Sequence, residues 1–120
     1  SVKNAINNFS NLKRKKGRKF LLLGDMLELG KKSDNYHKNL AYFINRSDID
    51  KLFVYGKNAF KTYQKTYKAK QGNILQNLND FDEVFSGIIN KDDYLMIKGS
   101  NATGLNKLSK IIISGFKYAL

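Results

Sequence analysis

The sequence predicts an α/β fold, a Rossmann-like three-layer domain with a mostly parallel sheet flanked by helices. Three short apolar runs each end in a glycine, and each is followed by a segment whose apolar residues recur with a helical period. Continuous apolar runs of about four residues are too short for helices and suit strands that are buried on both faces. Strands that alternate with helices are joined by right-handed crossovers, which makes the sheet parallel.

The expected elements follow one another along the chain in a regular order. The three apolar runs predict strands at 20–24, 52–56 and 94–99, and a weaker strand is expected at 73–76. Periodic apolar residues predict five helices, within 2–9, 36–44, 59–67, 81–88 and 105–116. Two helices carry apparent start signals: Ser33 with Asp34 before the second, and Asp80 with Glu83 before the fourth. We find no linker or repeat, so residues 1–120 are expected to form one domain.

Composition excludes several classes of function. The chain has no cysteine, which excludes disulfides, thiolate zinc sites and cysteine nucleophiles. His37 is the only histidine and has no carboxylate three or four residues further on, so no metal site is expected. Instead, we expect His37 to lie on a helix surface or to pack against a loop, with a role as general base as the alternative. No apolar run approaches the ~20 residues of a membrane span, and no signal segment follows the N-terminus. A cytoplasmic location is therefore expected.

The formal charge of +12 raises the question of a nucleic-acid partner. Only Lys13–Lys19 is a dense basic cluster, and the other lysines are scattered along the chain. No aromatic–glycine signature of RNA binding accompanies the charge. A solvated, lysine-rich surface is the favoured interpretation, with neither nucleic acid nor a membrane as partner.

The loop after the first strand offers one candidate site residue. Ligands of open α/β sheets bind outside the carboxyl ends of the strands, so the glycines that end the three apolar runs converge on the ligand-binding edge. Asp25 stands at this edge, where a carboxylate can meet a cation, a ribose hydroxyl or a phosphate-bound Mg²⁺. Asp is equally common as a capping or turn residue, and the sequence leaves both roles open.

The loop after the last strand offers an anion site. Lys98 supplies a charge and Ser100 a hydroxyl, and small residues before a helix expose backbone N–H groups to a carboxylate or phosphate. The alternative is that Ser100, Asn101 or Thr103 caps the helix and Lys98 faces solvent. The sequence contains no Gly-x-x-x-x-Gly-Lys-Ser/Thr phosphate loop, no Gly-x-Gly-x-x-Gly motif and no nucleophile elbow.

Together the two loops resemble a known family. The string 24–30 (Gly-Asp-Met-Leu-Glu-Leu-Gly) with Ser33 and His37 downstream, and Lys98-Gly99-Ser100 before a glycine-containing turn, are similar to the C-terminal domain of Mur ligases. The opening residues 1–6 resemble a helix of the same domain. One departure is Asn101, which stands where many family members have Arg.

The resemblance implies an ATP-dependent peptide ligase that adds D-alanyl-D-alanine to UDP-N-acetylmuramoyl-tripeptide. ATP and Mg²⁺ would be bound mainly by a central domain of the full-length enzyme, so this domain alone would be inactive. The resemblance further implies that Asp25 lies near the nucleotide as a catalytic residue. It also implies that the dipeptide is held by Lys98, Gly99, Ser100 and Asn101. His37 receives no role. The alternatives are a sibling ligase, folylpolyglutamate synthase-like or of another Mur type, and a basic nucleic-acid-binding α/β module.

Overall fold

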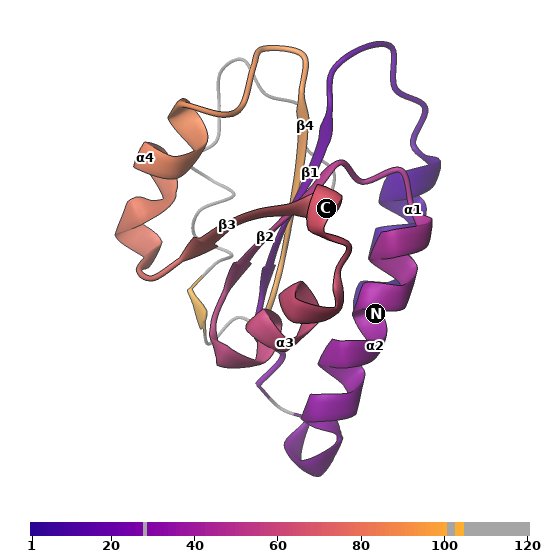
Figure 1. The fold of residues 1–120 in the computed structure, drawn as a ribbon, viewed down its shortest axis with the longest axis vertical. Coiled ribbons are helices and arrows are strands. Elements are labelled where there is room, and N and C mark those ends of the chain that lie inside the picture. The colour runs from indigo at the N-terminus through magenta and orange to yellow at the C-terminus, as the bar shows by residue number, and fades with distance from the viewer. Residues whose placement is uncertain (28, 101–102, 105–120) are drawn as a thin grey trace.

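The described residues form a parallel four-stranded sheet with helices on both faces (Figure 1). This computed structural model describes residues 1–27, 29–100 and 103–104. The strands lie in the order β3-β2-β1-β4 and have these bounds: β1 Lys19–Gly24, β2 Lys51–Tyr55, β3 Gln71–Leu75 and β4 Tyr94–Lys98. The α/β class is confirmed, and the weaker strand expected at 73–76 is β3.

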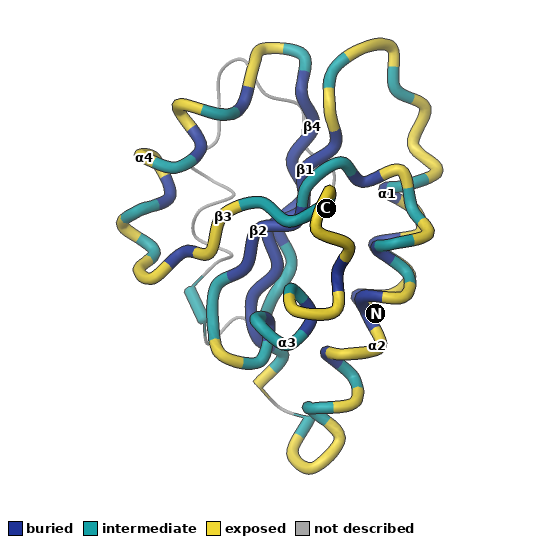
Figure 2. Tube along the Cα trace, in the orientation of Figure 1, coloured by how far each residue is buried: buried dark blue, intermediate teal, exposed yellow. Residues whose placement is uncertain are grey.

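Burial on both faces explains the continuous apolar runs. β1 lies between β2 and β4, and all of its residues are buried. Leu21 and Leu23 join the apolar cluster under α1, α2 and α3, whereas Phe20 and Leu22 join the cluster under α4. Figure 2 shows the same arrangement, with buried strands at the centre and exposed segments around them. Such a strand cannot show polar alternation, because neither of its faces meets water.

Four of the five expected helices lie in the described part of the chain. Their bounds are α1 Val2–Asn11, α2 Ser33–Arg46, α3 Lys57–Lys65 and α4 Phe81–Ser86. Short 3₁₀ turns occupy Gly30–Lys32, Lys68–Lys70 and Leu78–Asp80. The helix expected within 105–116 lies outside the described residues. In the ranges that are described, no helix has the length and apolar character needed to cross a membrane.

Neither apparent start signal makes the side-chain capping bond that it predicts, although Asp80 does directly precede α4. Ser33 is the first residue of α2 rather than its N-cap, and neither Lys32 before α2 nor Asp80 before α4 makes a side-chain capping bond. The reason is that a 3₁₀ turn precedes each helix, so the flanking residue already has helical backbone angles. A capping residue normally has extended backbone. The capping box lies one turn earlier, between Asn77 and Asp80.

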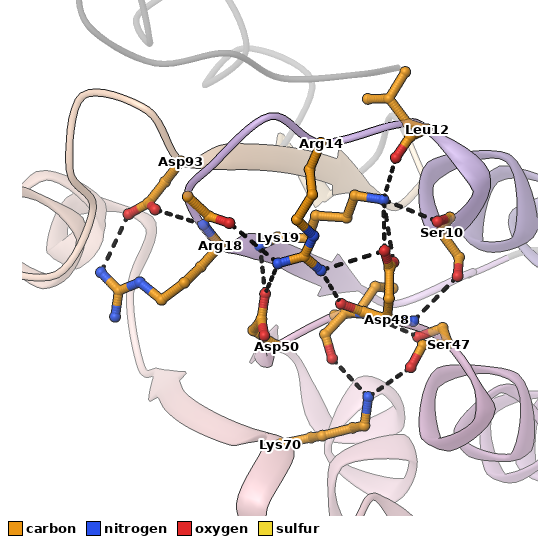
Figure 3. Close-up of polar contacts among 12 residues, drawn as sticks. Ser10, Leu12, Arg14, Arg18, Lys19, Ser47, Asp48, Asp50, Lys70 and Asp93 are labelled. Carbon is orange, nitrogen blue, oxygen red and sulfur yellow. Dashed lines mark hydrogen bonds and ion pairs between the residues drawn. The ribbon is translucent and has the colours of Figure 1, made fainter.

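The basic cluster Lys13–Lys19 is only partly the solvated surface that the sequence predicts. Lys19 is fully buried at the amino end of β1 (Figure 3). Its ammonium donates to the carbonyl oxygens of Ser10 (2.8 Å) and Leu12 (2.5 Å), and to both carboxylate oxygens of Asp48 (2.9 and 3.1 Å). A lysine with no access to solvent requires such a complete set of acceptors.

The two arginines of this cluster are also paired. The Arg14 guanidinium donates to Asp50 at 2.8 Å. Arg18 donates to Asp93 through its backbone N–H at 2.7 Å and through its guanidinium at 3.2 Å. Asp50 and Asp93 directly precede β2 and β4, and parallel strands all begin at the same edge of a sheet. The topology therefore brings these carboxylates to the cluster, and three of its cations stabilise the fold instead of facing a partner.

Candidate functional site

Asp25 lies at the carboxyl edge of the sheet, and its carboxylate caps α3. The side chain is buried, and its Oδ1 accepts the backbone N–H of Ala59 at 2.7 Å. Gly56, the N-cap of α3, has no side chain to make this bond and has a φ of 113°. A Cβ at position 56 would lie 2.5 Å from the Asp25 carboxylate. Asp25 therefore replaces the missing capping side chain of Gly56, and only glycine leaves room for it.

Ser100 contacts the same loop from the end of β4. Its backbone N–H donates to the carbonyl oxygen of Asp25 at 3.0 Å, and its Oγ accepts the N–H of Leu27 at 2.9 Å. Two of the predicted site residues, Asp25 and Ser100, are thus brought together across the β1–β4 edge. Because Oγ is the acceptor in this bond, the Ser100 hydroxyl can also donate its proton to a second group.

Lys98 is the last residue of β4 and lies two positions before Ser100. It is half-buried and lies opposite Leu23 of β1. Strand alternation puts it on the same face as Tyr94 and Met96. No hydrogen bond or ion pair with another described residue occupies its ammonium, so it can meet an external anion. Gly99 separates Lys98 from Ser100, and Asn101 lies outside the described residues.

The same edge carries a groove that the sequence does not indicate. It encloses about 640 Å³ at the carboxyl ends of β2 and β3, beside the start of α3. Its lining residues are Tyr55, Gly56, Lys57, Phe60, Ile74, Leu75 and Gln76. They combine aromatic and aliphatic surface with one cation and one amide. Sequence reasoning missed the groove because residues from the ends of two strands and the start of a helix form it together, and β3 carries only a weak pattern.

His37 packs against the Asp25 loop, which confirms the loop-packing interpretation of this residue. It is fully buried in α2. Its Nε2 lies 3.1 Å from the backbone nitrogen of Met26, and its Nδ1 lies 2.7 Å from the carbonyl oxygen of Ser33. Within residues 1–27, 29–100 and 103–104, no three His, Cys, Asp or Glu side chains gather closely enough to hold a metal.

The fold and this edge define a class of protein. It is a Rossmann-like α/β domain that presents a lysine, a serine and an apolar groove at the ligand-binding edge of its sheet. Its sequence lacks a phosphate loop, so the nucleotide cradle common in ATP-dependent enzymes is absent from this chain. Such an edge suits binding and positioning of a substrate.

Comparison with known proteins identifies the family. The model of the Mur ligase, glutamate ligase domain, matches residues 1–101, and this chain belongs to that family. The chain is 30% identical over 107 residues to the UDP-N-acetylmuramoyl-tripeptide–D-alanyl-D-alanine ligase of Bacillus subtilis (strain 168). It is 29% identical over 119 residues to the ligase of the same name from Buchnera aphidicola subsp. Acyrthosiphon pisum (strain APS).

These matches cover most of this chain but only part of each relative. They cover 81% and 98% of this chain, which spans 22% and 26% of the two ligases. The crystal structure of the MurF ligase from Thermotoga maritima in complex with ADP superimposes with a TM-score of 0.67 at 21% identity. That match covers 92% of this chain and 23% of the other, and it confirms the fold.

Proposed function

We propose that this chain is the amino-substrate-binding, C-terminal domain of an ATP-dependent ligase that adds D-alanyl-D-alanine to UDP-N-acetylmuramoyl-tripeptide. The observation that carries the proposal is the match to ligases of that name over up to 98% of the chain. The full-length enzyme that contains this domain is called the parent ligase below. Its UDP-sugar peptide, ATP and Mg²⁺ would be bound mainly by its other domains.

The chemistry assigns this domain a positioning role. In the proposed reaction ATP transfers its terminal phosphoryl group to the terminal carboxylate of the tripeptide and leaves as ADP. The amine of the dipeptide then attacks the acyl phosphate and releases phosphate. The dipeptide carboxylate must be held while its amine reacts. The ammonium of Lys98, which has no hydrogen-bond or ion-pair partner among the described residues, and the hydroxyl of Ser100 offer donors for it, because charge-assisted bonds are the strongest available to a carboxylate. Gly99 and Asn101 belong to the same proposed dipeptide site. Domain closure would then complete the site.

The first prediction separates this domain from its parent. The 120-residue chain should fold cooperatively and hydrolyse no ATP, because it has no phosphate loop. The parent ligase should form the pentapeptide product from ATP, the tripeptide and D-alanyl-D-alanine. Phosphate release and product formation measured on both proteins test this expectation. ATP turnover by the 120-residue chain above the blank would contradict it.

The second prediction concerns the charge of Asp25. Asp25→Asn keeps an oxygen that can accept the Ala59 N–H but loses the favourable interaction of a carboxylate with a helix N-terminus, so stability should fall by about 0.3–1 kcal/mol. If the carboxylate also faces the bound nucleotide, turnover of the parent ligase should fall by roughly tenfold or more, since tenfold corresponds to about 1.4 kcal/mol. Steady-state kinetics and thermal unfolding of the same variant distinguish the two effects.

A matched control for Asp25→Asn is Asp82→Asn, which changes an exposed carboxylate in the first turn of α4. This control should leave turnover unchanged. Wild-type turnover in Asp25→Asn would restrict Asp25 to its capping role.

A further inference from the structure

The partners of His37 define which of its ring nitrogens carries the proton. Nδ1 lies 2.7 Å from the carbonyl oxygen of Ser33, which can only accept, and 3.2 Å from the Ser33 hydroxyl, which can accept as well as donate. The shorter contact requires a donor, so we assign the proton to Nδ1. Nε2 lies 3.1 Å from the backbone nitrogen of Met26, which can only donate, so Nε2 is bare. The fully buried ring is therefore a neutral imidazole with its proton on Nδ1. An imidazolium would direct an N–H at the N–H of Met26.

The Met26 N–H and the Asp25 carbonyl belong to one peptide unit. This unit is planar, so its two polar groups turn together. His37 holds the N–H end, and the backbone N–H of Ser100 holds the carbonyl end at 3.0 Å. If the His37 bond is lost, the bond from Ser100 is the remaining one of these two, and rotation of the plane would carry the Asp25 carbonyl away from Ser100. A residue of α2 is thereby linked to a contact of the loop after β4.

The flanking contacts make this peptide the joint between three elements. The Asp25 carboxylate is anchored on α3 through Ala59, and the Leu27 N–H is anchored on Ser100. His37 is the contact with α2, and its own carbonyl accepts the hydroxyl of Thr62 in α3 at 2.5 Å. No water-facing group of His37 remains to take part in chemistry, because its ring is fully buried.

We propose that His37 is a positioning residue of the ligase reaction: its Nδ1-protonated ring fixes the Asp25–Met26 peptide and thereby sets the position of Ser100 at the dipeptide site. The mechanical part of this proposal concerns the fold alone, and the catalytic part rests on the proposed function. His37 acts through Met26, Asp25 and Ser100 and touches no substrate.

The first test is direct because the chain has one histidine. Long-range ¹H–¹⁵N correlation spectra of the ¹⁵N-labelled 120-residue chain should show one imidazole, protonated at Nδ1 and bare at Nε2. A ring protonated at Nε2 or at both nitrogens near neutral pH would overturn the proposal. This measurement needs no variant and no activity.

The second test uses a pair of variants that separate the two bonds of the ring. His37→Gln retains an oxygen near the position of Nε2 that can accept the Met26 N–H, whereas His37→Asn is too short to reach it. A buried donor left without a partner costs about 1–3 kcal/mol, so amide hydrogen exchange at Ser100 should accelerate roughly 5- to 150-fold in the Asn variant. Exchange in the Gln variant should stay within about threefold of wild type. Equal exchange in both variants would overturn the coupling.

The control is Thr62→Val, which removes a hydrogen bond to the carbonyl of His37 but leaves its ring in place. Ser100 exchange should not change in this variant, which separates the specific coupling from a general loss of stability.

The parent ligase tests the catalytic part. His37→Asn should raise the KM for D-alanyl-D-alanine about 5-fold or more with little change in the KM for ATP, and His37→Gln should restore it. A parent ligase that forms no pentapeptide even in its wild-type form would refute the proposed function, while the tautomer and the Ser100 exchange still decide the coupling. Normal dipeptide kinetics in His37→Asn, with accelerated Ser100 exchange, would refute the positioning role alone.

Discussion

Lys98→Ala in the parent ligase should lower kcat/KM for D-alanyl-D-alanine by roughly thirty- to several-thousand-fold. The physical reason is that a carboxylate leaving water loses a charged donor, which typically costs about 2–5 kcal/mol. Lys98 makes no hydrogen bond or ion pair with any other described residue, so its removal breaks no polar contact of the described fold. Steady-state kinetics with the dipeptide and ATP varied in turn should show a raised KM for the dipeptide and an almost unchanged KM for ATP.

Two further variants calibrate this result. Ser100→Ala should have a milder effect of about two- to twelvefold, because a neutral hydrogen bond contributes about 0.5–1.5 kcal/mol. Lys65→Ala removes an exposed lysine at the other end of α3 and should leave both KM values unchanged. A wild-type KM for the dipeptide in Lys98→Ala and Ser100→Ala, with weakened use of ATP, would show that this loop faces the nucleotide.

Lys19→Met should be the most destabilising of the substitutions considered for the basic cluster Lys13–Lys19. Breaking a buried ion pair from one side typically costs about 3–5 kcal/mol. The Asp48 side chain is 44% exposed and keeps Arg14 at 3.3 Å, so we expect about 2–4 kcal/mol. At about 4 °C per kcal/mol for a chain of this size, the unfolding midpoint should fall by roughly 8–16 °C. Thermal and urea unfolding of the 120-residue chain measure both quantities.

The pH dependence identifies the cause of this loss. Burial by itself raises the pKa of Asp48, but the hydrogen bonds and charges of Lys19 and Arg14 outweigh it and lower the pKa overall. A lowered carboxyl pKa contributes stability that is present at neutral pH and is lost as the pH falls through the acidic range. The difference in stability between wild type and Lys19→Met should therefore narrow on acidification.

The control for Lys19→Met is Lys16→Met, which changes a lysine that is 75% exposed and pairs with Asp92 at 3.2 Å. It should change stability by less than about 0.5 kcal/mol. An equal loss of stability in Lys19→Met and Lys16→Met would show that the buried contacts of Lys19 contribute no more to stability than an exposed ion pair.

Local patterns were sufficient to predict the architecture and to place the candidate site residues at one edge of the sheet. The runs that became β1, β2 and β4 are apolar throughout because both faces of each strand are covered, and this is visible in a single segment. Parallel strands put Asp25, Gly56 and Lys98 at one edge as soon as the order of elements is known. Two of the five residues of β3 are exposed and only one is buried, so its apolar pattern in the sequence is weaker.

What the sequence by itself determined, then, is which segments become strands and helices and which residues reach the carboxyl edge, because those properties depend on neighbours a few positions away. Only the tertiary structure decided which groups become hydrogen-bond partners. Arg18 meets Asp93 across 75 residues, Asp25 meets Ala59 across 34, and Leu27 meets Ser100 across 73. A hydrogen bond requires two groups within about 3 Å, and no local period encodes a distance between segments that far apart. For the same reason, the sequence alone predicts that Lys19 is a surface lysine, and only the fold shows that it is buried.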